Sequence, residues 1–389
     1  MQALVVGGGI MGLSAAWGLR RMGCTVTVLE QGALPNPLGS SGDHHRLIRY
    51  AYGPELGYTR LMRPAYAAWD LLWQTLGVCH HRPSGTLVMA SEDLAWAEAS
   101  LAHLQTCGHA VEHLTTAQIE RDYPHLHPEG LDLSYRLPTG GVLMAEQIVS
   151  DLAQFLQYSG VTVAPGMPVS EVDPARGSVC LEDGTRLGAD LVVVAAGPWA
   201  SRLLPSLSSR VTPSRQVVVY LTPPESLSTA WAASPMILDI GGAGGIYVVP
   251  PRGGAGLKVG DHSFSLTGDP DVDRTAGQDE VDALVQACRG RIKDLDTYSV
   301  QASKTCFYTV QPEEHFIVQR EDRAWIMTGF SGHGFKFGAL MGLMTAQAAM
   351  GFIPPQTIRA LAAGQITDPD ELCRLTDPVL GQTSGGPSL

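Results

Sequence analysis

A short apolar run that ends in spaced glycines constrains the fold of this chain more than any other feature of its sequence. Leu4-Val5-Val6 is followed by Gly7, Gly9 and Gly12, and residues 13–19 then carry apolar side chains at helical spacing. This order predicts a strand, a tight turn and a helix. In such a G-x-G-x-x-G pattern the first glycine permits the turn, the second lets a pyrophosphate approach the backbone, and the third lets the helix pack on the strand. The sequence therefore predicts phosphates at the helix N-terminus, where the helix dipole favours an anion.

A carboxylate at the end of the next predicted strand narrows the choice of nucleotide. The segment 24–29 is rich in β-branched residues, and Glu30 follows it directly. Glu30 lies 30 − 12 = 18 positions after Gly12, close to the ~20 at which a carboxylate holds a ribose hydroxyl. An acidic residue here suits a free ribose and repels a 2′-phosphate, which leaves FAD and NAD as candidates. A glycine triplet by itself is compatible with an ordinary turn, but the strand and helix on either side favour a nucleotide site.

Length, charge and cysteine content exclude several classes of protein. The 389 residues are 44% hydrophobic, enough for a large core in two domains or in one domain with an insertion. A net charge of −12 argues against nucleic acid and anionic membranes as partners. The seven cysteines show neither a metal-binding nor a disulfide pattern, so we expect no metal and a cytoplasmic location. No apolar run reaches the ~20 residues of a membrane span, and the first strand begins too early for a signal peptide.

The order of the predicted elements indicates a discontinuous architecture. We expect helices at 58–76, 91–106 and 145–157, strands at 161–164, 177–182 and 190–195, and a strand, glycine-rich turn and helix within 324–350. Alternating segments between 215 and 310 suggest an antiparallel sheet. Nucleotide-type strands thus occur at the start, middle and end of the chain, which is more typical of FAD proteins than of simple NAD dehydrogenases.

These elements predict an α/β fold with two parts. The first is a Rossmann-like, glutathione-reductase-like FAD-binding domain formed by 1–80, 140–214 and 311–375. The second is a discontinuous antiparallel-sheet substrate domain formed by 81–139 and 215–310. Residues 376–389 are expected to be a flexible tail, because they are rich in Gly and Ser and lie at the chain end.

Two arginines follow the first nucleotide motif. Arg46 and Arg49 lie three positions apart and would share a face if their segment were helical, although the aliphatic residues around them look buried. A single arginine is usually a solvated surface charge, whereas a pair beside a nucleotide site in an acidic protein favours anion binding. The later strand that ends in Gly197-Pro198-Trp199 is compatible with a second nucleotide contact and equally with a plain core strand.

At four separated motifs, spread over almost the full length, the chain resembles the monomeric sarcosine oxidase and N-methyltryptophan oxidase family within the D-amino-acid-oxidase-like flavoproteins. The motifs are Val6 to Gly12 with Glu30, Arg46 to Gly53, Gly256 to His262, and Thr305 to Thr309 with Gly329 to Phe337. The resemblance implies FAD as the cofactor. The residues expected to contact it are Gly7, Gly9, Ile10, Met11, Gly12, Glu30, Gln31, Ser41, Arg46, Val169, Gly197, Trp199, Cys306, Gly332, Gly334, Phe335 and Lys336.

The resemblance also implies covalent attachment of the flavin. In that family a cysteine at the position of Cys306 forms a thioether to the 8α-methyl group of FAD. A thiolate can add to an electron-poor flavin methide, and neighbouring positive charge would lower the pKa of the thiol. Without the surrounding motif, Cys306 would be interpreted as a small buried hydrophobic residue.

Three cations match catalytic groups of the family. Lys258 matches the lysine that activates oxygen, since a cation beside the flavin stabilises developing superoxide. Arg49 and Lys336 match the pair that holds the substrate carboxylate, for which arginine offers a planar fork and lysine a point charge. A surface position is the alternative interpretation of Lys258, but its place between Leu257 and Val259 favours an inward direction.

Three further residues match groups around the flavin and the amine. Arg46 matches a residue close to the flavin ring, where it would raise the electron affinity of the ring. Tyr247 and His262 match groups around the bound amine. For His262 a hydrogen-bonded interior imidazole is the alternative, and the lysine four positions earlier favours the functional interpretation.

The resemblance therefore implies a monomeric FAD-dependent oxidase of secondary (N-methyl) amino acids that converts a C–N bond to an imine and reduces O2 to H2O2. One alternative is the same chemistry on a cyclic or bulky amine, such as pipecolate or a fructosyl amino acid. Others are a flavin dehydrogenase with a non-oxygen acceptor and a non-catalytic flavoprotein subunit. The chain departs from the family at His44-His45, which includes one extra residue, and at Val248-Val249. Both departures lie on the expected substrate side and leave the identity of the amine open.

Overall fold

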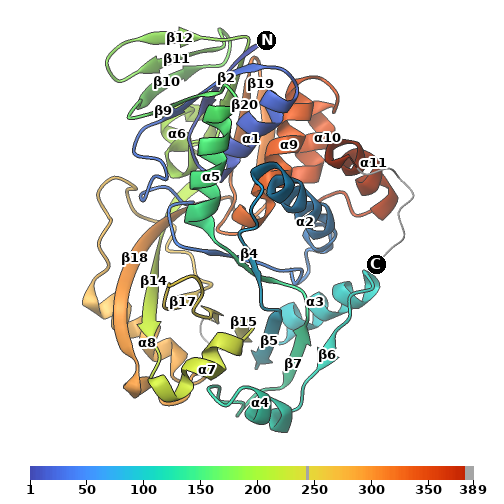
Figure 1. The fold of residues 1–389 in the computed structure, drawn as a ribbon, viewed down its shortest axis with the longest axis vertical. Coiled ribbons are helices and arrows are strands. Elements are labelled where there is room, and N and C mark those ends of the chain that lie inside the picture. The colour runs from blue at the N-terminus through green and yellow to red at the C-terminus, as the bar shows by residue number, and fades with distance from the viewer. Residues whose placement is uncertain (242–244, 382–389) are drawn as a thin grey trace.

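The computed structural model describes residues 1–241 and 245–381, and two large sheets organise it (Figure 1). A six-stranded sheet lies in the upper half of the view and an eight-stranded sheet in the lower half. The upper sheet has the order β19 (Ile317–Glu321), β20 (Ala324–Thr328), β13 (Leu191–Val194), β1 (Gln2–Val6), β2 (Thr25–Glu30) and β9 (Thr162–Pro165). Its pairings are parallel except between β19 and β20.

Strand β1 occupies an interior place in the upper sheet because its residues can be buried on both faces. Ala3 to Val6 are all buried, and the same is true of β13 and β20. Such unbroken apolar strands are typical of parallel sheets covered by helices. The helices packed around this sheet are α1 (Ile10–Arg21), α2 (Leu56–Leu76), α5 (Ala145–Tyr158), α9 (Gly338–Ala349), α10 (Pro355–Ala362) and α11 (Pro369–Leu380).

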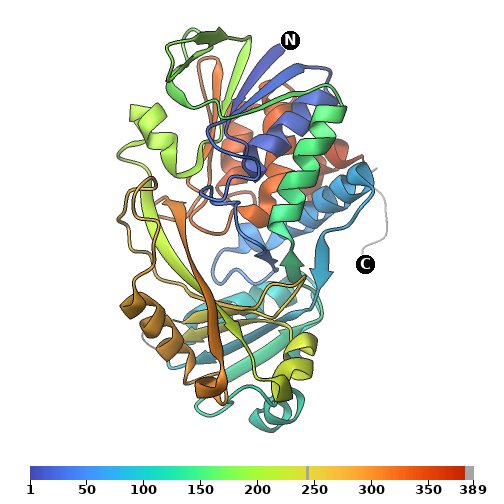
Figure 2. The ribbon, with the colours of Figure 1, turned by 60° about the vertical axis from the view of Figure 1, so that its left-hand side comes forward.

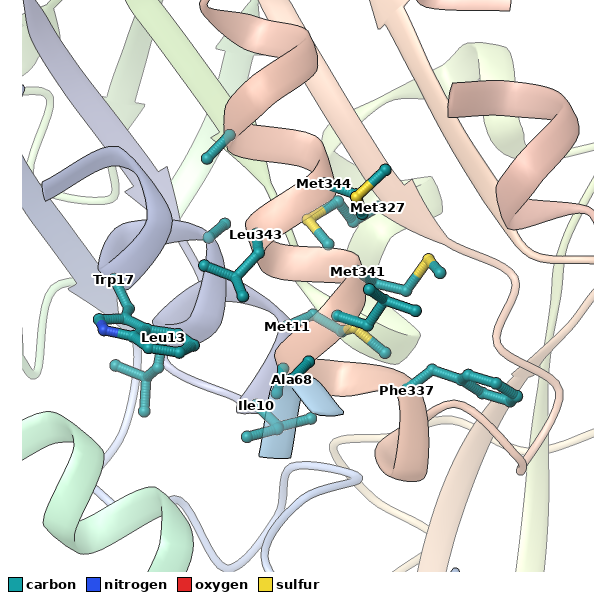
Figure 3. Close-up of a cluster of buried hydrophobic side chains, with 14 of the residues drawn as sticks. Ile10, Met11, Leu13, Trp17, Ala68, Met327, Phe337, Met341, Leu343 and Met344 are labelled. Carbon is teal, nitrogen blue, oxygen red and sulfur yellow. The ribbon is translucent and has the colours of Figure 1, made fainter. Parts of the chain in front are cut away.

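Helices from the two ends of the chain, α1 and α9, pack directly on each other (Figure 3). Leu13 and Trp17 of α1 lie against the helix that carries Leu343 and Met344. A Cβ atom at Gly342 would lie 2.3 Å from the backbone carbon of Ser14, so this close approach requires glycine. The contact binds the first motif of the sequence to the last one.

The lower sheet combines two separate parts of the chain. Its order is β18 (Ser299–Val310), β14 (Thr212–Thr222), β17 (Leu257–Asp261), β16 (Ile246–Val249), β15 (Met236–Gly241), β5 (Thr86–Ser91), β7 (Leu133–Leu137) and β6 (Glu112–His113). The predicted antiparallel pattern is present except between β15 and β5, which are parallel. Figure 2 shows the long strands β14 and β18 extending from this sheet toward the upper half of the molecule.

The two faces of the lower sheet have different roles. Val219, Leu257 and Val259 point into an apolar core that also contains residues of α7 (Glu225–Ala233) and α8 (Gln278–Cys288). Because side chains alternate along a strand, Tyr220 and Lys258 point to the opposite face, toward the upper sheet. Cross-strand pairing places Lys258 directly opposite Tyr220. This second face supplies much of the candidate site.

The remaining elements connect or extend the two large sheets. One three-stranded sheet contains β3 (Arg46–Ile48), β8 (Gly141–Leu143) and β4 (His81–Pro83), and another contains β10 (Val169–Asp173), β11 (Ser178–Leu181) and β12 (Arg186–Gly188). The other helices are α3 (Ala95–Thr106), α4 (Thr116–Asp122), α6 (Ala200–Leu203) and the 3₁₀ turns Gly197–Trp199, Pro205–Leu207, Leu295–Thr297 and Phe335–Phe337. Within the described ranges no helix is both long and apolar enough to cross a bilayer.

The predicted α/β fold is confirmed, with two local corrections. The segment that carries Arg46 is the strand β3, not a helix, because its aliphatic residues pair with β8 in a sheet. The tail expected from residue 376 is helical through Leu380, since Thr376 and Leu380 are buried on the inner side of α11. The rest of that tail, 382–389, lies outside the described residues. The division of the chain into two domains at the stated boundaries stays a prediction.

Candidate active site

Two cavities lie next to each other at the carboxyl ends of the parallel strands. The first has a volume of about 570 Å³ and is lined by the turn Gly7–Met11, so we call it the glycine cavity. The second has a volume of about 520 Å³ and is lined by Arg49, Lys258 and Lys336, so we call it the cationic cavity. The two share four lining residues, which are Arg46, Tyr308, Gly332 and Phe335. A long ligand can therefore contact both.

The glycine turn is shaped by two positions that exclude a side chain. Gly7 has φ +106°, and a Cβ atom there would lie 2.4 Å from the carbonyl oxygen of Ala195. A Cβ atom at Gly12 would lie 1.9 Å from the carbonyl oxygen of Gly7, so the third glycine lets α1 start directly against the turn. Gly9, the N-cap residue of α1, has no side chain to cap the helix; Ser41 Oγ accepts from the N–H of Ile10 (3.1 Å), and the N-terminus can bind an anion with the next N–H groups.

Glu30 lies beside this turn, as its spacing in the sequence predicts. Its carboxylate accepts hydrogen bonds from the backbone nitrogens of Gly8 (2.7 Å) and Gly32 (3.0 Å) and from the amide of Asn36 (2.8 Å). These donors hold an acidic group on the wall of the glycine cavity. A carboxylate here can accept from ribose hydroxyls and repels a 2′-phosphate.

The structure gathers most of the expected cofactor contacts in the glycine cavity. Its lining includes Gly7, Gly9, Ile10, Met11, Glu30, Gln31, Ser41, Arg46, Val169, Gly197, Trp199, Gly332, Gly334 and Phe335. Gly12 lies behind the turn, where it serves packing. Cys306 and Lys336 line the cationic cavity instead. The strand before Gly197 thus contributes to the cavity as well as to the core.

The cationic cavity brings together every residue expected to take part in catalysis. Its lining includes Arg46, Arg49, Tyr247, Lys258, His262 and Lys336, together with Cys306. These residues come from β3 and the segment after it, from β16 to β18, and from the turn before α9. They converge because the polar face of the lower sheet points at the end of the upper sheet.

Lys336 is a buried cation and Arg49 a half-buried one, and neither has a counter-ion among the described residues. Both lie against the ring of Tyr52, the Arg49 guanidinium carbon at 4.8 Å and Lys336 Nζ at 5.4 Å from its centroid. Lys336 Nζ donates only to the backbone oxygen of His333 (3.1 Å), and Arg49 Nη1 has no partner. Among the described residues, no carboxylate lies within ion-pair distance of either. Burial, together with the charge of Arg49, lowers the pKa of Lys336 well below its ordinary value.

Lys258 is a buried cation of a different kind, because a carboxylate holds it. Lys258 Nζ is 2.5 Å from Asp43 Oδ2 and is 4% exposed. Asp43 also accepts from Arg46 Nη1 (2.8 Å) and from the Tyr220 hydroxyl (2.6 Å). Burial alone would raise the pKa of Asp43, but the charges of Lys258 and Arg46 hold it well below its usual range. Burial lowers the pKa of Lys258, and Asp43 acts against this.

Tyr247 and His262 provide uncharged polar groups on the same cavity wall. Their rings are 5.7 Å apart. A Cβ atom at Gly260 would lie 2.4 Å from the ring of Tyr247, so this glycine lets the ring lie flat on β17. Burial, with the nearby charge of Arg49, lowers the pKa of His262 to about 4, and the imidazole is therefore neutral near pH 7.

Cys306 lies on the face of β18 that lines the cationic cavity. Its pairing partner on β14 is Gln216, and Tyr308 lies two residues further along the same face. The expected lowering of the Cys306 pKa by neighbouring positive charge is present, from Arg46, Lys258 and Arg274, but it is smaller than the effect of burial. Burial raises the pKa of Cys306, and the charge of Arg46 only partly offsets this rise.

Sequence reasoning assigns no role to Asp43 or to two residues that donate to it, Tyr220 and Lys304, and it notes His45 only as a departure on the expected substrate side. His45 is fully buried, lines the cationic cavity and leaves both ring nitrogens without a partner. Burial, together with Lys258, lowers its pKa to about 3, so this imidazole is neutral too. A signal for Asp43 exists in its spacing, three residues before Arg46, but its contact with Lys258 joins residues 215 positions apart.

The residues of the glycine cavity fit FAD. The helix start at the glycine turn suits a pyrophosphate, and the carboxylate of Glu30 suits a ribose that carries no phosphate. The sequence profile of the FAD-dependent oxidoreductase family (DAO) matches residues 2–348. The chain belongs to this family, and FAD, which the glycine pattern leaves beside NAD, is confirmed as its cofactor.

Individual relatives agree with the resemblance read from the motifs. The monomeric sarcosine oxidase of Bacillus sp. (strain NS-129) is 28% identical over 370 residues, which cover 89% of this chain and 92% of that protein. The N-methyl-L-tryptophan oxidase of Yersinia pestis (strain Pestoides F) is 26% identical over 377 residues, covering 92% and 97%. Among solved structures, NikD, an amino acid oxidase of nikkomycin biosynthesis, shares the fold with a TM-score of 0.79 at 22% identity, covering 93% and 96%.

Proposed function

We propose that this protein is an FAD-dependent oxidase of secondary, N-methyl amino acids, which converts a C–N bond to an imine and reduces O2 to H2O2. The observation that carries the proposal is a pair of cations, buried Lys336 and half-buried Arg49, for which the described residues supply no counter-ion; Arg49 Nη1 is itself buried and has no partner. Burying an unpaired charge is costly, so such a pair is retained where a ligand supplies the opposite charge. The carboxylate of an amino acid supplies it.

The remaining groups of the cationic cavity suit the amine of such a substrate. A secondary amine must be neutral before it can lose a hydride, and a cavity lined by cations disfavours its ammonium form. His262 and Tyr247, both uncharged at neutral pH, can exchange hydrogen bonds with the amine without adding charge. Bound FAD supplies the acceptor for the two electrons of the substrate. Arg49 and Lys336 orient the substrate against it.

Two further roles follow for residues on the polar face of the lower sheet. We assign to Lys258 the stabilisation of negative charge that develops on oxygen, and to Cys306 the attachment of the flavin as a thioether; the position of both residues on the cationic cavity supports this. The names of the relatives support this reading, since they are sarcosine and N-methyltryptophan oxidases. We also propose a cytoplasmic monomer, in keeping with the seven free cysteines and the monomeric relative.

Anaerobic mixing with a panel of amino acids tests the function. We expect N-methyl amino acids to bleach the flavin absorbance, and air to restore it with release of one H2O2 per substrate. The panel includes sarcosine, larger N-methyl amino acids, pipecolate, a fructosyl amino acid and primary amino acids. The apolar wall formed by Leu238, Ile240 and Val249 favours the larger substrates. Bleaching without oxygen consumption in air would assign a dehydrogenase instead.

Denaturation in acid tests the covalent attachment. We expect the precipitate of the wild-type protein to stay yellow, and that of Cys306→Ala to release its colour to the supernatant. Cys180→Ala is the matched control, because Cys180 is also partly exposed and lies outside both cavities. Release of flavin from the wild-type protein would reject the thioether.

A further inference from the structure

The carboxylate of Asp43 contacts Lys258, the cation to which the proposed function assigns the reaction with oxygen. Asp43 is buried and is the acceptor closest to Lys258 Nζ, at 2.5 Å. Its two oxygens are fully engaged: Oδ2 accepts from Lys258 and Arg46, and Oδ1 from Tyr220 at 2.6 Å and Lys304 at 3.4 Å. With these partners on several sides, the carboxylate has little freedom to rotate.

We propose that Asp43 is a positioning residue for Lys258: it fixes the ammonium at one place on the wall of the cationic cavity and keeps it charged while oxygen is reduced there. This inference rests on the proposed function, in which Lys258 faces the oxygen. Asp43 itself acts through Lys258. The residue is one that neither the glycine pattern nor the catalytic motifs single out.

A comparison within the same cavity shows what the carboxylate contributes. Lys336 is about as buried as Lys258, 6% against 4% exposed, but within the described part of the chain its hydrogen-bond partner is a single backbone carbonyl. Burial shifts the pKa of both lysines downward, and for Lys258 alone a carboxylate opposes the shift. Lys336 can obtain its counter-charge from the substrate. Oxygen arrives uncharged, so Lys258 needs a counter-charge of its own.

The net charge of Asp43, Lys258 and Arg46 together is positive, so this group of side chains favours an anion beside it. Asp43 and Lys258 cancel, and the charge of Arg46 remains beside them. The other titratable groups that face the pair are His44 and His45 before β3, Tyr220 on β14, Tyr247 on β16, and Lys304 and Cys306 on β18. Asp43 is therefore the only carboxylate in direct contact with Lys258 among the described residues, and removing it leaves an ammonium among positive neighbours.

Oxygen needs this positive charge early in its reduction. In forming H2O2, oxygen takes up two electrons and one proton from the reduced cofactor and a second proton from the solvent. Negative charge develops on the oxygen before both protons have arrived. A charged group fixed in advance stabilises that state without having to reorient. A lysine that has lost its proton cannot do so.

The pH dependence of flavin reoxidation in Asp43→Asn tests the proposal. We expect the rate constant with O2 to fall as pH rises through a midpoint at least one pH unit lower than in the wild-type protein. Below that midpoint Lys258 is charged in both proteins, so the rate should recover to within about tenfold of the wild-type rate, and the remaining loss reflects an ammonium that is no longer held in one place. Reduction by substrate under anaerobic conditions should change by less than about threefold. A pH-independent loss would overturn the inference.

Two variants control for structural damage at this position. Asp43→Glu keeps a carboxylate and should restore most of the wild-type midpoint. Tyr220→Phe removes one hydrogen bond to Asp43 without changing charge, and should leave the midpoint in place. If Tyr220→Phe shifts the midpoint as far as Asp43→Asn does, loosened packing and not the carboxylate is responsible.

A second readout does not depend on turnover. The chain has four lysines, at 258, 293, 304 and 336, so ¹⁵N-lysine spectra are simple to assign by single substitutions. In the oxidised, substrate-free protein, the Lys258 resonance should titrate at lower pH in Asp43→Asn than in the wild-type protein. The Lys293 resonance serves as an internal control. An unchanged Lys258 titration would contradict the proposal even if the variant is inactive.

A double variant separates this inference from the proposed function. In a Lys258→Met background, Asp43→Asn should have no further effect on reoxidation, because Asp43 acts through Lys258. If Lys258→Met alone leaves reoxidation unchanged, the oxygen role of Lys258 in the proposed function fails. If Lys258→Met slows reoxidation but Asp43→Asn does not shift its midpoint, the proposed function stands and this inference fails.

Discussion

The cationic cavity contains two pairs of cations, each with one buried lysine and one half-buried arginine, and the two pairs differ in their contacts with carboxylates. Arg49 and Lys336 lie against Tyr52 with no carboxylate near them. Lys258 and Arg46 share the carboxylate of Asp43. All four side chains line the same cavity, so a general difference in burial does not explain the contrast.

The presence or absence of a carboxylate partner indicates which of these cations interact with a ligand that carries its own negative charge. An unpaired pair of cations stays costly until an anion arrives, which makes it selective for a substrate that brings one. A paired cation is stable in the empty site, and it is ready for an anion that forms only during the reaction. In the proposed function, the first group binds the substrate carboxylate and the second stabilises charge during the reaction.

Arg49→Met should give the largest effect, because it removes one of the two cations that we expect to bind the substrate carboxylate. We expect the Kd of a carboxylate inhibitor to rise by about 100- to 1000-fold, since two charge-assisted hydrogen bonds are lost. Titration of the flavin spectrum measures this Kd. An amine without a carboxylate serves as the control ligand, and its weak binding should hardly change. Equal losses for both ligands would place the carboxylate elsewhere.

Lys258→Met should affect the second group without affecting the first. We expect reoxidation by O2 to slow by about 100-fold, the usual loss when one fixed charge-stabilising donor is removed. Stopped-flow mixing of the reduced enzyme with O2 measures this rate, and carboxylate inhibitors should bind as before. Equal slowing of flavin reduction by substrate would reject the division of roles.

Stability should change with opposite signs when each group loses a lysine. Lys336→Met removes an unpaired buried charge and should stabilise the substrate-free protein by about 1–2 kcal/mol, whereas Lys258→Met leaves Asp43 with fewer donors and should destabilise it by about 1–2 kcal/mol. Denaturant midpoints at pH 7, measured without substrate, provide the comparison. If the free energy of unfolding changed in the same direction in both variants, the proposed difference between paired and unpaired lysines would be rejected.

The affinity for a carboxylate inhibitor should also depend on pH, and we expect this effect to be smaller than those of the substitutions above. The pKa of Lys336 is lowered in the free protein, and a bound carboxylate raises it. Binding therefore takes up protons at pH values between the free and bound pKa, and affinity falls as pH rises through that window, by at most about tenfold per pH unit. Calorimetry in two buffers of different ionisation enthalpy measures the uptake. Lys336→Met should abolish it.

The two cavities differ in how far the sequence predicts them. The glycine cavity is built from backbone close to one motif, and Glu30 reaches it because β1 and β2 are neighbours in the sheet. Spacing alone is then sufficient to place Gly7, Gly12 and Glu30. The cationic cavity is built from side chains on distant strands, and its members were found by resemblance to a family.

The contact between Asp43 and Lys258 could not be predicted from the sequence. It depends on the register that sets Tyr220 opposite Lys258 and on the course of the loop before β3. No local pattern encodes either of them. Likewise, the spacing of three between Arg46 and Arg49 is compatible with a helix and also with the short strand that pairs with β8. In both examples the outcome depends on pairing between segments that are distant in the sequence.

The interior position of β1 has a consequence for biosynthesis. This first strand receives its neighbour β13 only after residue 191 has been made, and α1 receives α9 only after residue 338. The ribosome must therefore synthesise the chain beyond residue 338 before α9 can cover α1 and enclose the glycine turn, so we expect stable flavin binding only after that point.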